Sequence, residues 1–191
     1  MLIEDGSGGG YKTGVDSNNR MKTYSYTRTD TADNSIRIGD SYEMATGSFI
    51  TLATDTNEHA IMYVKNTSST KSMLIESIRT CGTASLKWIL YKNDTGGDLI
   101  SDGNAGAELN HNFHSTNVAP ADLWVASASG KTRSGGTWMS QHIDSTGHSI
   151  EKFNGYLILG TNDSLTLTAQ NTTAVASTDC CVRVHAYFEA L

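Results

Sequence analysis

Residues Asn154–Glu189 indicate the architecture of this chain more clearly than any other segment. They read NGYLILGTNDSLTLTAQNTTAVASTDCCVRVHAYFE. Two apolar runs, at 156–159 and 165–169, flank a Gly-Thr-Asn-Asp turn. Residues 181–189 then alternate apolar and polar side chains with the period of two that is typical of a half-buried β-strand. The segment therefore predicts two strands joined by a turn, with a third strand after a polar loop.

On the last of these strands, successive side chains point to opposite faces. The apolar face holds Val182, Val184, Ala186 and Phe188, and the other face holds Arg183, His185, Tyr187 and Glu189. His185 and Tyr187 are large for a face in contact with water. We therefore expect this second face to be covered in part, by a loop or by a neighbouring subunit, and we name both residues as interface candidates.

Signals of the same kind recur along the rest of the chain. From Ser35 onward, about nine or ten strand-like runs are separated by Gly-, Asn- and Ser-rich turns roughly every 8–12 residues, and no convincing amphipathic helix occurs. Only 18% of the residues are charged and there is one proline, so neutral Thr, Ser and Asn cover the surface, as suits strands and turns. We predict an all-β fold, a jelly-roll-like antiparallel β-sandwich over residues 29–191.

Residues 1–28 differ from the rest, because they hold too little apolar area to fold alone. The stretch 5–10 is rich in glycine, and 16–20 has the composition of a turn. We expect an extended N-terminal arm that adds strands to the edge of a neighbour; a disordered tail is the alternative. The side chains expected at that interface are Ile3, Tyr11, Val15, Arg20, Tyr24 and Tyr26.

Charge and hydropathy exclude some classes of partner. The net charge is −6 and no lysine or arginine cluster occurs, so we expect no nucleic-acid partner. No run of 18 apolar residues is present, so we expect no membrane partner. The start at 1–5 lacks the basic and apolar regions of a signal peptide.

The cysteines are Cys81, Cys180 and Cys181. An odd count argues against a disulfide framework. Cys180 and Cys181 would point to opposite faces of a strand. We expect all three to be reduced, small buried side chains made in a reducing cytoplasm.

Motifs with a recognised chemistry are weak. Residues 129–132, Ser-Gly-Lys-Thr, resemble the end of a phosphate-binding loop, but Val125 stands where that loop needs a glycine. Acidic and amide side chains at 94–102 could hold calcium, although their spacing does not fit an EF-hand, and Asp94 and Asp98 have the setting of turn residues.

The histidines leave a metal-dependent, cupin-like enzyme open as an alternative, through His111, His114, His142 and His148 with Asp144. Their spacing matches no complete ligand set, so solvated histidines are the simpler interpretation. We predict no catalytic residue, no metal site and no cofactor.

Tryptophans are the best candidates for sugar stacking. Trp88 lies on a well-patterned core face, whereas Trp124 and Trp138 flank the long polar loop 127–137. We therefore name Trp124 and Trp138 as candidate glycan contacts.

Several segments, in order, resemble those of structural proteins from the virions of tailed bacteriophages. They are the start IEDGSGGGYK with VDSNNRM, the run AIMYVKN followed by a polar hairpin and MLI, the segment LNHNF at 109–113, and the ending GYLILG with VRVHAYFE. Each is weak alone, and together they touch most of the chain.

The resemblance implies a non-enzymatic virion protein, located on the capsid exterior and made in the bacterial host cytoplasm. Members of this general kind look like jelly-roll proteins that decorate or cement capsids. The implied partners are the major capsid protein and neighbouring copies in a homotrimer. A tail or fibre component that binds host-surface glycan is the alternative.

Overall fold

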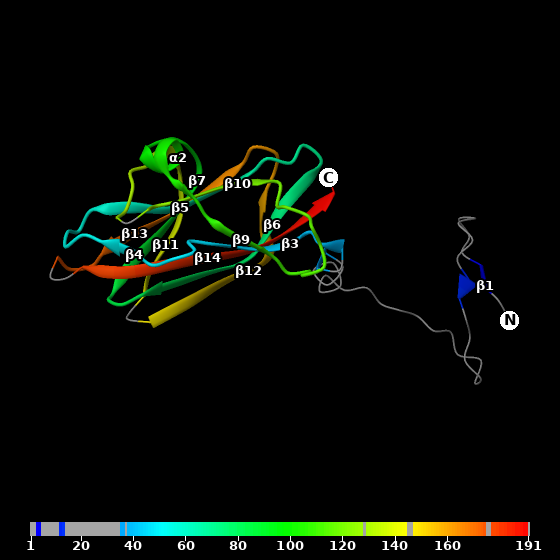
Figure 1. Cartoon of the computed structure of the whole chain (residues 1–191), viewed down its shortest axis with the longest axis horizontal. Coiled ribbons are helices and arrows are strands. Elements are labelled where there is room, and N and C mark those ends of the chain that lie inside the picture. Colours follow the sequence, from blue (N-terminus) through cyan, green and yellow to red (C-terminus); the bar gives the residue numbers. More distant parts are fainter. Residues whose placement is uncertain are drawn as a thin grey trace. The chain divides into compact units, whose positions relative to one another are not determined.

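The computed structural model describes residues 3–4, 12–13, 35–36, 38–127, 129–144, 147–174 and 177–190. The chain divides into two units, Met1–Asp33 and Asn34–Leu191 (Figure 1). In the first unit, β1 (Ile3–Glu4) pairs antiparallel with β2 (Lys12–Thr13). The other arm candidates, Tyr11, Val15, Arg20, Tyr24 and Tyr26, lie outside the described residues, as does the predicted boundary after residue 28.

Strands are the main elements of the second unit. They are β3 (Ser41–Ala45), β4 (Ile50–Leu52), β5 (Glu58–Asn66), β6 (Lys71–Gly82), β7 (Leu86–Gly96), β8 (Asn104–Ala105), β9 (Ala107–Asn110), β10 (Ala121–Val125), β11 (Ser134–Asp144), β12 (Gly147–Leu159), β13 (Ser164–Asn171) and β14 (Thr178–Ala190). The short helix α2 (Asp98–Asp102) lies against β5, β7 and β10 (Figure 1).

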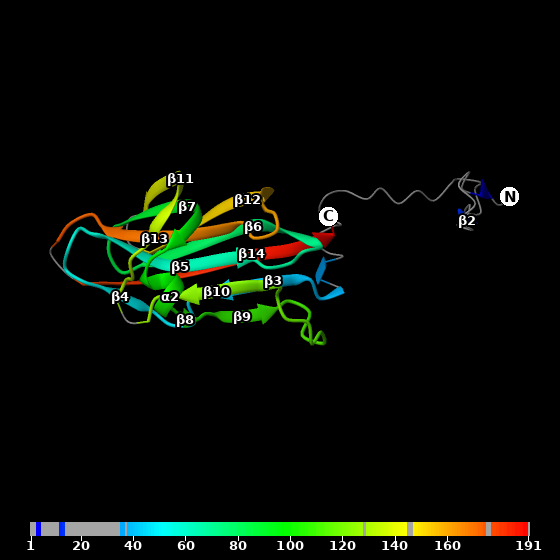
Figure 2. The ribbon, with the colours of Figure 1, turned by 90° about the horizontal axis from the view of Figure 1, so that it is seen from above.

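Two antiparallel sheets pack face to face, which confirms the predicted all-β sandwich (Figure 2). One sheet has the order β11-β7-β13-β5-β10-β8 and is called the β13 sheet below. The other has the order β12-β6-β14-β3-β9, with β4 also paired to β14, and is called the β14 sheet. The last two strands therefore lie inside the sheets, β13 between β7 and β5 and β14 between β6 and β3.

The buried face of β14 forms part of the core. Val182, Val184 and Ala186 are fully buried and Phe188 is 1% exposed, which confirms the predicted apolar face. Burying a valine or phenylalanine side chain stabilises the fold by roughly 1.5–3 kcal/mol. Across the sandwich, the β13 sheet contributes Leu86, Trp88, Leu165 and Leu167 to the same cluster.

Strand β6 contains a β-bulge where it pairs with β14. The register passes from His185 opposite Ser77 to Ala186 opposite Ile75, so Glu76 is the extra residue on β6. A bulge shifts the side-chain alternation of its own strand by one residue. Ile75 and Ile78 therefore both face the core, although they are three residues apart.

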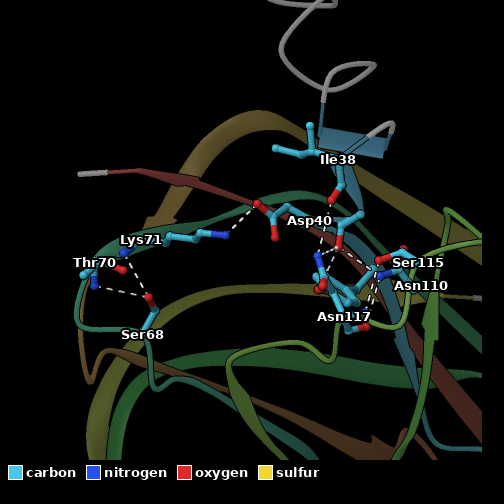
Figure 3. A network of polar contacts seen from close by, with 10 residues as sticks. Ile38, Asp40, Ser68, Thr70, Lys71, Asn110, Ser115 and Asn117 are labelled. Carbon is cyan, nitrogen blue, oxygen red and sulfur yellow. Dashed lines mark hydrogen bonds and ion pairs between the residues drawn. The ribbon is translucent and has the colours of Figure 1, made fainter.

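The first residues of the sandwich are held by a polar network around Gly39 (Figure 3). The carbonyl oxygen of Gly39 accepts hydrogen bonds from the Tyr42 hydroxyl and the Asn110 amide, at 2.9 Å each. Gly39 has φ of +78°, and a Cβ at this position would overlap Ser115 Oγ. Beside it, Lys71 Nζ lies 2.6 Å from the Asp40 carboxylate.

The prediction that all cysteines are reduced is wrong. Cys81 on β6 and Cys181 on β14 are directly opposed and form a disulfide, with Cα atoms 5.2 Å apart. An odd number of cysteines still allows one disulfide, and the order of strands in the sheet places Cys81 next to Cys181. Cys180 faces the core as the free, buried cysteine, so the expected opposite orientation of Cys180 and Cys181 is confirmed.

Candidate functional site

The outer face of the β14 sheet gathers polar and reactive side chains in rows across neighbouring strands. Opposed residues of an antiparallel pair lie on the same face. One row holds His148, Cys81 and Cys181, and the next holds Ile150, Arg79, Arg183 and Ala45. A third row holds Lys152, Ser77, His185, Glu43 and Leu109. The strand pairing thus brings side chains from five segments that are distant in the sequence onto one surface.

Two shallow depressions open on this face. The disulfide depression has a volume of about 310 Å³ and is lined by Arg79, Thr80, Cys81, His148, Cys181 and Arg183. The Phe49 depression has a volume of about 330 Å³ and is lined by Glu43, Ala45, Thr46, Gly47, Ser48, Phe49, Cys181, Val182 and Arg183. Cys181 and Arg183 belong to both, so the two depressions adjoin.

Charge is distributed unevenly around the depressions. Arg183 makes a 3.2 Å ion pair with Glu43, and its side chain is more than half exposed. Arg79 is exposed and has no carboxylate within ion-pair distance among the described residues. His148 is exposed beside Cys81. The disulfide depression therefore holds one guanidinium, that of Arg79, that has no carboxylate partner among the described residues, on a chain of net charge −6.

His185 lies next to this region, in a cluster with His111 and Ser41. The Ser41 hydroxyl is hydrogen-bonded to His111 Nδ1 at 3.0 Å and to His185 Nε2 at 3.2 Å. The two imidazole rings meet edge to face, with centroids 4.6 Å apart. Burial, and secondarily the neighbouring His111, lower the pKa of His185 to about 4, so the ring is neutral at pH 7.

This chain's own residues cover much of the face that holds His185 and Tyr187, in keeping with the expectation that the face is partly covered. His185 is half-buried beside His111, and Tyr187 is 2% exposed. Tyr187 opposes Leu74, which is also buried although neither belongs to the main core cluster. Contact of either residue with a partner stays a prediction.

The two tryptophans named for glycan binding lie in one row of the β13 sheet, but at opposite ends of it. The row runs Trp138, Tyr91, Thr166, Tyr63 and Trp124. Neighbouring strands are roughly 4.8 Å apart, so four spacings separate the indoles by roughly 19 Å. Trp138 is 55% exposed on the edge strand, whereas Trp124 is partly buried against the core. They cannot stack on one sugar ring.

The remaining histidine candidates are dispersed. His114 is exposed, and His142 lies 3.5 Å from Asp144 and 3.8 Å from Glu151. Within the described ranges, no three His, Cys, Asp or Glu side chains are grouped so as to hold a metal ion.

Asp94 is not the solvated turn residue that the sequence indicates. Its side chain is fully buried, and Arg133 Nε and Nη2 each donate a 2.9 Å hydrogen bond to it. Arg133 also covers the Tyr91 ring, 3.4 Å from the centroid. The carboxylate is therefore already neutralised, which leaves no free calcium ligand at this position.

The segment that resembles a phosphate-binding loop leads into strand β11 rather than into a helix. Lys131 exchanges backbone hydrogen bonds with Ala60, and its Nζ lies 2.9 Å from Asp102. These contacts give the lysine a structural partner.

Sequence reasoning missed three contributors to the outer face: the disulfide, Arg79 and Phe49. Each lies on a strand or turn that was recognised, but only the strand order reveals their proximity. In comparisons with known proteins, the chain matches no family model, no curated protein and no solved structure. In the part of the chain that the structure describes, no helix is long and apolar enough to cross a membrane.

Proposed function

We propose that this chain is a non-enzymatic structural protein of a tailed-bacteriophage virion, a capsid decoration or cement protein that stabilises the head. The observation that carries the proposal is the outer face of the β14 sheet. Four large apolar side chains are exposed there, at 43–63% of their surface: Phe49, Leu109, Ile150 and Ile158. They lie on β9, on β12 and in the turn before β4, with polar residues between them, so a partner would have to cover this face broadly to bury them all.

The resemblance to virion proteins supports a location on the virion, and the exposed apolar side chains of the outer face support attachment to a partner. The partners are the major capsid protein and neighbouring copies, with a homotrimer as the assembled form. Several weak contacts made together raise the overall affinity without requiring a large interface in each copy. The division of the chain into two units, Met1–Asp33 and Asn34–Leu191, is compatible with such multivalent attachment.

Binding to particles tests the proposal. The full chain is mixed with phage particles that lack it, and bound copies are counted after sedimentation. Saturable binding at a fixed number of copies per capsid, with density on the head in electron micrographs, supports the proposal. Density on the tail, or no binding, contradicts it. A chain lacking residues 1–25 should bind with lower occupancy if the arm contributes.

A tail or fibre component that binds host-surface glycan is the second candidate. Trp138 favours it, because this side chain is 55% exposed beside Tyr91, and an exposed indole can stack on a sugar ring. A glycan array probed with the full chain and with Trp138→Ala tests it. An array without hits removes this candidate.

A further inference from the structure

Two arginines oppose each other on the outer face of the β14 sheet. Arg79 on β6 and Arg183 on β14 are direct cross-strand partners, two residues from the bridged Cys81 and Cys181 on the same strands. Like charges in this position are unfavourable. One nearby carboxylate, Glu43, pairs with Arg183, and among the described residues none pairs with Arg79. The arrangement therefore leaves one guanidinium available to an anion.

The surroundings of the pair form a shaped site. The disulfide depression lies between the two arginines and His148, with the disulfide and Thr80 also lining it. A carboxylate placed there would meet donors from both guanidinium groups, which suit planar oxyanions. Its charge would also relieve the repulsion between Arg79 and Arg183.

The Phe49 depression adjoins on the other side of Arg183 and offers apolar contact through Phe49 and Ala45. We propose that the two depressions together bind an extended acidic segment of a partner protein, with a carboxylate between Arg79 and Arg183 and an apolar side chain against Phe49. This inference rests on the proposed function, because it names the chemistry by which the partner is held.

Charge complementarity favours an acidic peptide over a phosphate polymer. The chain as a whole carries a net charge of −6, which repels a long polyanion such as a nucleic acid. The cationic site is small and has an apolar neighbour, so it matches one carboxylate followed by an aliphatic or aromatic side chain. A partner segment of alternating acidic and apolar residues fits both depressions.

The test uses the full chain and a blocked hexapeptide of alternating Glu and Leu, titrated by calorimetry. A peptide with Gln in place of every Glu is the matched ligand. We expect the Glu peptide to bind, and the Gln peptide to bind at least about tenfold more weakly, because charge-assisted hydrogen bonds are lost. Arg79→Gln should weaken binding of the Glu peptide by about tenfold.

Lys92→Gln is the control variant, because Lys92 is an exposed cation on β7 in the other sheet. It removes the same charge and should leave peptide affinity unchanged. Unfolding midpoints of both variants should match that of the wild-type chain, since Arg79 and Lys92 are exposed. Equal affinities for Arg79→Gln and the wild-type chain overturn the inference.

Inorganic phosphate and a single-stranded DNA oligomer are titrated in parallel. Binding of either with higher affinity than the Glu peptide overturns the assignment to an acidic peptide. Particle binding separates this inference from the proposed function. If the chain binds the peptide but no particle, the inferred site stands and the proposed virion function fails. If Arg79→Gln decorates particles as well as the wild-type chain does, the inferred site fails and the proposed virion function stands.

Discussion

Cys81 and Cys181 are directly opposed on β6 and β14 and are joined by a disulfide, although 100 residues separate them in the sequence. The bridge links two neighbouring strands on the outer face of the β14 sheet. Both cysteines line the disulfide depression and Cys181 also lines the Phe49 depression, so the bridged pair both joins the strands and shapes the surface.

Breaking this bridge should lower stability. In the chain-entropy model, a bridge that closes a loop of this length restricts the unfolded chain by up to about 4.7 kcal/mol, and typical measured values are about 2–4 kcal/mol. The double variant Cys81→Ser/Cys181→Ser should lose about 2–4 kcal/mol in urea unfolding at pH 7. Reductant should destabilise the wild-type chain and leave the double variant unchanged. A wild-type chain that is fully alkylated yet equally stable would contradict this.

The compartment of assembly predicts when the bridge forms. Bacterial cytoplasm keeps thiols reduced, so a virion protein made there should acquire the Cys81–Cys181 bridge only after release of the particle. Alkylation of cells before lysis, followed by peptide mass spectrometry, should find both cysteines modified. The same peptides from released particles should be bridged. A bridge already formed inside intact cells contradicts the predicted site of synthesis.

Stability should fall at acidic pH through His185. Burial and the neighbouring His111 lower its pKa from 6.5 to about 4, so the folded state holds the ring neutral while the unfolded chain binds a proton. This contribution is complete above pH 6.5 and is lost as the pH falls toward 4. Because solvent reaches part of the ring and screens it, we expect about 1–2 kcal/mol.

Urea unfolding at pH 7 and pH 4.5 measures this effect as a difference between variants. His185→Gln keeps a hydrogen-bonding side chain without a titrating ring, so it should lose less stability on acidification than the wild-type chain. His114→Gln is the control, since His114 is exposed. An equal pH dependence for all three chains would rule out His185 as the source.

Arg133→Ala should be strongly destabilising, because it leaves the fully buried Asp94 carboxylate without its two hydrogen bonds. An unpaired buried charge of this kind costs about 3–5 kcal/mol. Arg133→Lys should recover part of the loss, since an ammonium group cannot make both bonds in the same geometry. Lys131→Ala, two residues away, removes an ion pair with the exposed Asp102 and should change stability little. Comparable losses in the two alanine variants would disprove the distinction.

The two tryptophans should respond differently to truncation. Trp124→Ala should cost about 2–3 kcal/mol, because the indole packs against the core cluster. Trp138→Ala should stay within about 0.5 kcal/mol of the wild-type chain, because its indole is 55% exposed. Thermal or urea unfolding measures both. Only Trp138→Ala is therefore a clean probe of glycan binding.

The secondary structure could be predicted where it rests on local periodicity, and less well elsewhere. Leu86, Trp88 and Leu90 alternate on a strand as expected, and all three are buried. The strand β11 begins at Ser134, in a segment that the sequence assigns to a loop, since Gly135 and Gly136 are turn formers with positive φ. Helix α2 has only five residues, within a turn-rich stretch, and its buried Leu99 gives no periodic signal.

What the sequence determined by itself is the alternation of β14, with its apolar and polar faces, and the all-β class, because side-chain direction in a strand is a local property of period two. What only the tertiary structure decided is which strands lie side by side. The pairs Cys81–Cys181, Arg79–Arg183 and Asp94–Arg133 join segments 39 to 104 residues apart. No local pattern encodes such contacts, since they arise when two sheets bury their apolar faces together and fix the order of the strands.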